Sequence, residues 1–595
     1  MRWRDVIVWL VCGLVAGGLL LTAGLQLGSI NAKRLEMKLV RNDPLENAPP
    51  SLAFATVAMG AFRGLVVDIL WIRADAMKEK GQFFDAKQLA EWITMLQPRF
   101  AAVWEFHAWN MAYNISVAIP ATQPDQRWHW VKNGYELLRD KGIPLNPKSL
   151  DLYRELGWIF QHKMGGITDD AHRYYKVQFA REIGPLVNST DNAFFEALAK
   201  APVDWPRIAA DAKVSPLIEA LKGADPAFTE PDQFVSRYLA IVQDPNRFGV
   251  TARQVLKSFE DTPVLRRFDE IAKAYQLRRV WKMDPAFMVE LNRRYGPVDF
   301  NDPNHVIPLD WRHPDTHAIY WAAMGLKLAA QDQGRPLDTP ELNTDRIIMH
   351  SLQNLFRYGK LLFFNVEVAP PDGSAAERPA IVTDVFVRPD LRMFDRYHQA
   401  VLSVLNKYKT NGSREESVGS GHRNMLKNAI LDFYQAGLVS QAQRIYKQLR
   451  GFYPLPEFDV PLVEFCRQRF IDELNGLSIT EATEQIGSLL RESYYLYAIQ
   501  SDDETFGRET LAQQIYDYYQ KQYADEKRLS LPEMTLMRYT ALIDFLQDPQ
   551  YPPYLQQNLM ARIKVERPKL FEQLQQQDQE LRNKAQQNQP AVPTP

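Results

Sequence analysis

The chain is poor in cysteine and has no marked excess of charge of either sign. Two cysteines among 595 residues, Cys12 and Cys466, exclude a disulfide scaffold and are too few for a cysteine-rich zinc site. The formal net charge is −2, so no basic excess points to nucleic acid as a partner. An apolar fraction of 46% with nearly balanced charge excludes a disordered acidic or basic chain.

Long apolar runs are scarce, with one exception at the N-terminus. A mean hydropathy of −0.34 excludes a polytopic membrane protein. Residues 6–27 carry no charged side chain, and at 1.5 Å rise per residue they are long enough to cross a bilayer core. We therefore expect a short tail, 1–5, followed by a transmembrane signal anchor over 6–28. A cleaved signal peptide is the alternative, although no convincing cleavage site is present.

The charges around this segment leave its orientation open, because both flanks are basic. A short tail with two arginines usually stays inside, which favours a single-pass inner-membrane protein with its bulk on the extracytoplasmic side. A second apolar stretch, residues 51–77, is interrupted by Arg63, Asp68, Arg73 and Asp75. Charges at that depth are costly in a bilayer, so this stretch is predicted to be a packed amphipathic helix.

Catalytic and nucleotide-binding templates are absent. The sequence contains no GxGxxG after a strand, no GxxxxGK[ST], no GxSxG and no CxxCH. It therefore assigns no catalytic residue, no cofactor-binding residue and no metal ligand, and it implies no cofactor.

Two local patterns come nearest to a chemical site. His313-Pro314-Asp315-Thr316-His317, with His350 on the next predicted helix, supplies neighbouring metal-binding side chains. The alternative is a helix start, in which Asp315 complements the helix dipole and the histidines hydrogen-bond within a helix–helix contact. The absence of HExxH spacing favours the helix start, and whether His313 and His317 bind a metal stays open.

The second pattern, Glu492-Ser493-Tyr494-Tyr495, resembles the Glu-Ser start of soluble lytic transglycosylases. That resemblance implies Glu492 as a general acid. The downstream Gly-Leu-Met-Gln segment of that family is missing, so an amphipathic helix is the favoured interpretation of this stretch.

Helical periodicity dominates from about residue 51 onward. Apolar residues recur every three or four positions, and Pro, Gly or Asp-Pro separate blocks of helix length. Tyr153-x2-Leu156-Gly157-x2-Phe160 resembles the helix A motif of the tetratricopeptide repeat (TPR) family, and Trp321-x2-Met324-Gly325-x2-Leu328 resembles it with Met for Leu. Trp104-x2-His107-Ala108-x2-Met111 is a looser copy. The resemblance implies stacked helical hairpins, in which these aromatic residues are structural.

The predicted fold is all-α: an irregular TPR-like α-solenoid with one N-terminal transmembrane helix and a small β-hairpin insertion. The expected divisions are a linker 29–50, TPR-like repeats 51–186, an irregular helical insertion 187–300, TPR-like helices 301–360, a β-hairpin 361–388, C-terminal helical repeats 389–572 and a disordered Gln/Pro-rich tail 573–595. Within the C-terminal repeats, the polar segment 410–422 is predicted to be a loop.

These features favour a membrane-anchored scaffold that binds other proteins through its concave helical surface, in assembly of a bacterial envelope, secretion or pilus complex. An envelope hydrolase, lytic-transglycosylase-like or metal-dependent, built on a helical solenoid is the alternative. The sequence leaves the partner, the pathway, the oligomeric state and the role of the 187–300 insertion open.

Overall fold

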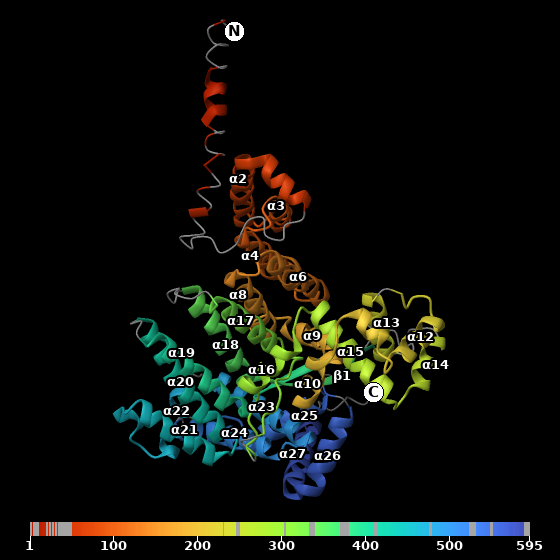
Figure 1. Cartoon of the computed structure of the whole chain (residues 1–595). Coiled ribbons are helices and arrows are strands. Elements are labelled where there is room, and N and C mark those ends of the chain that lie inside the picture. The colour runs from red at the N-terminus through yellow and green to blue at the C-terminus, as the bar shows by residue number, and fades with distance from the viewer. Residues whose placement is uncertain are drawn as a thin grey trace, which may run out of the picture. The chain divides into compact units, whose positions relative to one another are not determined.

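The computed structural model describes residues 50–229, 231–244, 250–300, 302, 305–331, 339–368, 380–409, 413–474, 479–522, 531–547, 551 and 553–587, with isolated pieces before residue 34. Contacts divide the chain into two compact units. Unit 1 comprises residues up to Leu361 together with Val387–Ala400, and unit 2 comprises Leu362–Phe386 and the residues from Val401 onward. The described residues are mostly helical, which confirms the all-α prediction at that level (Figure 1).

No helix among the described residues has the length and apolar content needed to cross a membrane. Eleven of the 23 residues of the predicted anchor, 6–28, lie outside the described residues, so this prediction stays open. The interrupted apolar stretch that follows it is part of one long helix, α2 (Pro50–Glu79), which packs against α3 (Phe83–Leu96).

The first part of unit 1 consists of helices that stack on one another. In Figure 1, α2 and α3 form the upper end of this stack, and α4, α6 and α8 follow below them. After α3 the elements are α4 (Ala101–Trp109), η1 (Asn110–Ile115), α5 (Ser116–Ala118), α6 (Pro124–Leu137), η2 (Leu138–Gly142), α7 (Ile143–Leu145), α8 (Leu150–Trp158), η3 (Ile159–Gly165) and α9 (His172–Val187). η1, η2 and η3 are π-helical turns, which are rare and frequently lie at functional sites.

The region predicted as an irregular helical insertion consists of short helices. They are α10 (Asn192–Lys200), α11 (Trp205–Ala210), α12 (Ser215–Ala224), α13 (Pro231–Gln243), α14 (Val250–Ser258), α15 (Pro263–Arg279) and α16 (Pro285–Tyr295). The Asp-Pro pairs act as helix boundaries. Pro285 opens α16, and the Asp284 side chain accepts a hydrogen bond from the Ala286 amide, as an N-cap does.

Two later helices of unit 1 complete its core. α17 (Pro314–Ala329) pairs with α18 (Thr339–Tyr358) and also packs against α8. The two TPR-like motifs therefore meet face to face. A Cβ atom on Gly325 would lie 2.7 Å from the Tyr153 Cβ, so α17 can approach α8 this closely because Gly325 has no side chain. Trp104, Tyr153 and Trp321 are all buried, in agreement with their predicted structural role.

The predicted β insertion is confirmed as a two-stranded sheet of β1 (Lys360–Val368) and β2 (Ala380–Arg388). A 3₁₀ turn, η5 (Leu391–Met393), then leads into α19 (Phe394–Tyr408), which begins in unit 1 and ends in unit 2.

Unit 2 continues with α20 (Ser413–Gln435), α21 (Val439–Phe452), η6 (Pro456–Phe458), α22 (Leu462–Leu474), α23 (Ile479–Ala498), α24 (Asp502–Gln522), α25 (Met534–Gln547), α26 (Pro553–Glu566) and α27 (Pro568–Gln587). Two sequence expectations differ from these bounds. α20 begins at Ser413, within the segment predicted as a loop. α27 extends to Gln587, so 573–587 is helical rather than a disordered tail, and 588–595 lie outside the described residues.

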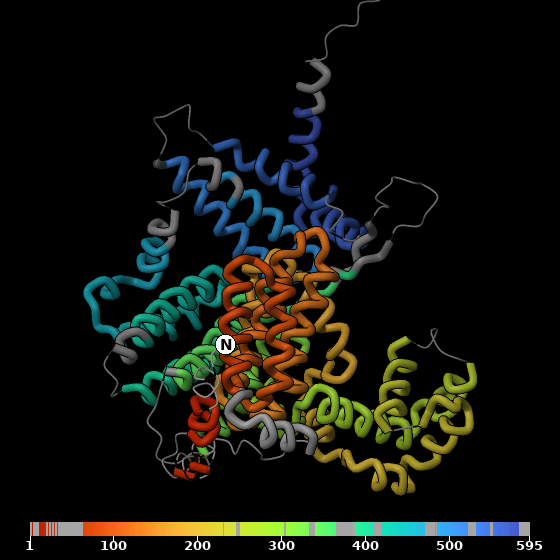
Figure 2. Tube along the Cα trace, turned by 90° about the horizontal axis from the view of Figure 1, so that it is seen from above, coloured from red at the N-terminus to blue at the C-terminus, as the bar shows by residue number. Residues whose placement is uncertain are grey.

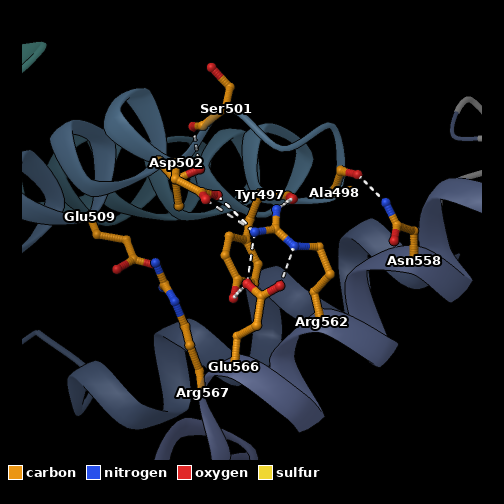
Figure 3. Close-up of polar contacts among 10 residues, drawn as sticks. Tyr497, Ala498, Ser501, Asp502, Glu509, Asn558, Arg562, Glu566 and Arg567 are labelled. Carbon is orange, nitrogen blue, oxygen red and sulfur yellow. Dashed lines mark hydrogen bonds and ion pairs between the residues drawn. The ribbon is translucent and has the colours of Figure 1, made fainter.

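Two polar side chains of α26, Arg562 and Asn558, hydrogen-bond to the last carbonyl groups of α23 (Figure 3). Arg562 donates to the Tyr497 carbonyl and to the Asp502 carboxylate, and its guanidinium stacks over the Tyr497 ring at 4.1 Å. Asn558 donates to the Ala498 carbonyl at 2.5 Å. The last carbonyls of a helix have no partner within it, so these contacts tie α26 firmly to the α23–α24 turn.

Candidate functional site

The metal-candidate residues of unit 1 form the start of a helix. His313 is the N-cap of α17, and its Nδ1 accepts a hydrogen bond from the Asp315 amide at 3.2 Å. His317 Nε2 lies 2.9 Å from the Trp311 carbonyl oxygen. Burial lowers the pKa of both imidazoles to about 3, which keeps them neutral. Within the described residues, no three His, Cys, Asp or Glu side chains are grouped in a way that could hold a metal ion.

A buried lysine lies at the centre of the same region. Lys176 of α9 is fully buried, and its Nζ donates to the Met164 carbonyl at 2.7 Å and to the Gly166 carbonyl at 2.8 Å. These carbonyls belong to the end of η3, where the negative end of the helix dipole attracts a cation. Burial lowers the pKa of Lys176, and the charge of Asp315 opposes that shift.

Asp315 approaches this lysine from the first turn of α17 and is also fully buried. Asn354 of α18 donates to its two carboxylate oxygens at 3.1 and 3.3 Å. Burial raises the Asp315 pKa well above its ordinary value. Asn354 also donates to the Gln161 carbonyl of η3 at 3.5 Å, so hydrogen bonds join η3, α9, α17 and α18. We call this buried cluster of Lys176, Asp315 and Asn354 the polar lock of the helix junction.

A second buried acid lies on α8. The Glu155 side chain is 6% exposed, and among the described residues its Oε1 has no hydrogen-bond partner. Burial, with an added contribution from the Glu105 charge, raises its pKa to about 8. Folding therefore favours a protonated Glu155 at neutral pH.

We expect this group to make unit 1 less stable as pH rises. A raised folded-state pKa contributes stability that is present below the ordinary pKa of 4.5 and is lost as pH rises to about 8. The slope from this group is at most about 1.4 kcal/mol per pH unit. In Glu155→Gln this contribution to the slope should disappear. The free energy of unfolding of the variant relative to the parent should therefore rise between pH 4.5 and about 8. Chemical unfolding at a series of pH values measures the difference.

Glu260→Gln is the matched control, because Glu260 is exposed on the surface of the insertion. Its pH profile should coincide with that of the parent. Parallel profiles for Glu155→Gln and the parent would contradict the assignment of a buried, protonated Glu155.

Glu492, the candidate acid of the hydrolase alternative, is held in an ion pair. Its Oε2 lies 3.0 Å from Arg508 Nε, which joins α23 to α24, and the carboxylate is 25% exposed. The two cavities described next do not include Glu492 in their lining.

The larger cavity is a groove in unit 2, formed by α20, α22 and α24, with a volume of about 620 Å³. Its lining combines apolar and aromatic side chains with charged and amide groups: Leu431, Tyr434, Gln435, Val463, Cys466, Arg467, Gln514, Asp517, Tyr518 and Lys521. We call this set the α20–α22–α24 groove.

Part of the groove lining is buried and apolar, whereas other lining residues are exposed to solvent. Leu431 and Cys466 are buried, and burial raises the pKa of the Cys466 thiol to about 12, so the nucleophilic thiolate is not populated at neutral pH. Val463 is 60% exposed, which is unusual for a large apolar side chain at the edge of a cavity. Asp517 and Lys521 are exposed charged residues of the same lining.

A glycine of α24 sets the geometry of this groove. A Cβ atom on Gly507 would lie 2.1 Å from the Gln435 carbonyl oxygen, so α24 crosses the end of α20 in direct backbone contact. Gly437, with φ of +77°, then turns the chain into α21. The crossing brings Tyr518 and Tyr434 onto the same groove.

A smaller cavity of about 570 Å³ lies between α23 and α25 in the same unit. Its lining is more polar and includes Arg491, Ser488, Thr540 and Asp544.

Sequence reasoning did not find the groove residues, although a signal was present. Ile430 and Phe433 of α20 are fully buried in the hairpin with α21. Leu431 and Tyr434 follow each of them directly, so α20 is apolar over a wider arc than one hairpin contact requires. A helix with so wide an apolar face is expected to pack against a second element or to line a cavity.

Comparison with known proteins gives no family assignment. No protein-family model matches the chain, and no significant match is found among curated proteins.

Proposed function

We propose that the chain is a membrane-anchored helical scaffold that binds a segment of another protein in the α20–α22–α24 groove. The observation that carries the proposal is the composition of this groove, which combines buried apolar residues and two tyrosines with exposed charged residues. Aromatic side chains are favoured as anchors in protein interfaces because they bury much area at little entropic cost. A peptide or helix that inserts a large apolar side chain fits such a groove.

The membrane part of the proposal rests on the sequence. The uncharged run of residues 6–27 supports a transmembrane anchor over 6–28, with the bulk of the chain on the extracytoplasmic side of the inner membrane. The resemblance of the sequence motifs to TPR proteins supports, by analogy, a role in assembly of an envelope, secretion or pilus complex.

The decisive variant changes the exposed apolar wall of the groove. Val463→Asp places a charge where a partner's apolar side chain would dock, so we expect the recovery of crosslinked partner proteins from intact cells to fall at least tenfold. The full-length chain with a C-terminal tag is crosslinked, purified and analysed by quantitative mass spectrometry. Circular dichroism confirms that the variant is folded.

Val565→Asp is the control, because Val565 is 78% exposed on α26 and does not line the groove. Partner recovery should be unchanged in this variant. Equal recovery with Val463→Asp would contradict binding in the groove. Loss of biological activity in Glu492→Gln, with the fold and partner recovery intact, would favour the hydrolase alternative instead.

A further inference from the structure

The terminal hairpin of unit 1 has an outward face that is apolar. Leu65, Ile69 and Ile72 of α2 are 58%, 51% and 68% exposed. Their spacing of four and then three residues places them on one side of the helix. On α3, Trp92 and Met95 are 45% and 63% exposed. We call these five residues the α2–α3 stripe.

The opposite sides of both helices are occupied, which fixes the stripe as the outer surface. Val67 and Ala74 of α2 are buried, and the Trp71 ring lies 5.1 Å from the Phe106 ring of α4. On α3 the buried residues are Ala86, Leu89, Ala90, Ile93 and Thr94. Seen from above, α2 and α3 lie side by side at the near end of the stack (Figure 2).

An apolar outer face is unexpected at this position. The terminal helices of a helical stack have one neighbour fewer, and a polar outer face is what keeps such a stack soluble. Exposed apolar groups that gather on one surface mark a contact with another molecule or with a membrane. Something apolar is therefore expected to cover the stripe.

The chain on the N-terminal side indicates the occupant. Residues 51–62 contain no charged side chain, and the uncharged run of residues 6–27 precedes α2 by 22 residues. Even fully extended, that connection spans at most about 80 Å, so α2 stays within this distance of a bilayer that holds residues 6–27. Tethering raises the effective concentration of the bilayer surface at the stripe, which makes a weak apolar contact persistent.

We infer that the α2–α3 stripe docks on the surface of the lipid bilayer, with its side chains among the headgroups and upper acyl chains. This inference rests on the membrane anchor of the proposed function. Tryptophan is a favoured residue at that depth, and Trp92 stands on the stripe.

The charges beside the stripe define the kind of lipid surface. Asp68, Arg73, Asp75 and Glu79 are exposed on α2, three acidic residues and one basic residue, so this surface does not attract anionic lipids. Binding of this kind depends on apolar burial rather than on attraction to anionic lipids. Uncharged phosphatidylcholine is therefore sufficient, and high salt does not release the contact.

The test uses the full-length chain in vesicles of phosphatidylcholine. A Cys12→Ser background is labelled with an environment-sensitive fluorophore at Ile72→Cys, at Thr22→Cys in the uncharged run, or at Lys213→Cys on the polar surface of the insertion. Cys466 is buried, and burial raises the pKa of its thiol to about 12, so it reacts far more slowly than an exposed cysteine. Quenching by spin-labelled lipids reports contact with the bilayer.

We expect labels 72 and 22 to be quenched several-fold more than label 213, in low and high salt alike. Quenching at 22 without quenching at 72 would overturn the lipid contact and leave the anchor standing. Absence of quenching at 22 would overturn the anchor and, with it, this inference. Shielding of label 72 from both lipid quencher and aqueous iodide would mean that protein covers the stripe. A requirement for anionic lipid would also overturn the proposal.

Discussion

Lys176→Met is expected to destabilise unit 1 by about 3–5 kcal/mol, because one member of a buried, hydrogen-bonded charge cluster is removed. Methionine fills most of the lysine volume but cannot donate to the Met164 and Gly166 carbonyls. Both carbonyls would stay buried without a partner, and Asp315 would lose the nearest positive charge. Urea unfolding followed by circular dichroism measures the loss.

Lys213→Met is the matched control, since Lys213 is exposed on the insertion. Its effect should stay within about 0.5 kcal/mol. The double variant Lys176→Met/Asp315→Asn should lose less than the sum of the two single changes, because the two side chains belong to one network. A loss below about 1 kcal/mol for Lys176→Met would contradict the polar lock.

Gly165→Ala is expected to cost about 3 kcal/mol, near the upper end for an overpacked core. The added Cβ would lie 2.1 Å from Asp315 Oδ2 and 3.0 Å from the Phe160 carbonyl oxygen. Asp315 cannot move aside freely, since it is fully buried and bonded to Asn354. The measurement is the shift of the thermal unfolding midpoint, with the denaturant midpoint as a second reading.

Gly223→Ala is expected to stabilise the folded chain instead. Gly223 lies near the end of α12, and no atom lies within 4 Å of an added Cβ. Alanine there should stabilise the chain by about 0.5–1 kcal/mol, because it restricts the unfolded chain and favours the helix. Equal effects at the two glycines would mean that Asp315 does not pack against Gly165.

Local signals in the sequence were sufficient for the all-α class and mark some of the helix starts. Asp284-Pro285 combines an N-cap acceptor with a fixed φ, and α16 begins there. The interpretation of His313 as part of a helix start is confirmed for the same reason. The likeness of the helical stack to TPR proteins stays a prediction.

Long-range contacts explain the elements that the sequence concealed. The segment 410–422 has the composition of a loop, yet α20 begins at Ser413. There the Tyr453 hydroxyl donates to the Gly419 carbonyl and lies 2.9 Å from His422 Nδ1. Tyr453 is distant in sequence, so no local pattern predicts that it supports this turn of α20.

The buried cluster and the groove were concealed for a related reason. Lysine is almost never fully buried, and Lys176 is accepted inside the protein because two backbone carbonyls of another helix converge on its Nζ. The α20–α22–α24 groove draws its lining from helices separated by up to about ninety residues. Its existence depends on the close crossing at Gly507, which a helical pattern does not reveal.

The three π-helical turns affect how this chain aligns with regular helical repeats. A π turn closes its hydrogen bond one residue later than an α turn, as the Gly166 amide does on the Gln161 carbonyl. η1, η2 and η3 each place such an extra residue inside a helix. A repeat template of fixed length therefore falls out of phase by one position at each turn, and correct alignment requires single-residue gaps within helices rather than in loops.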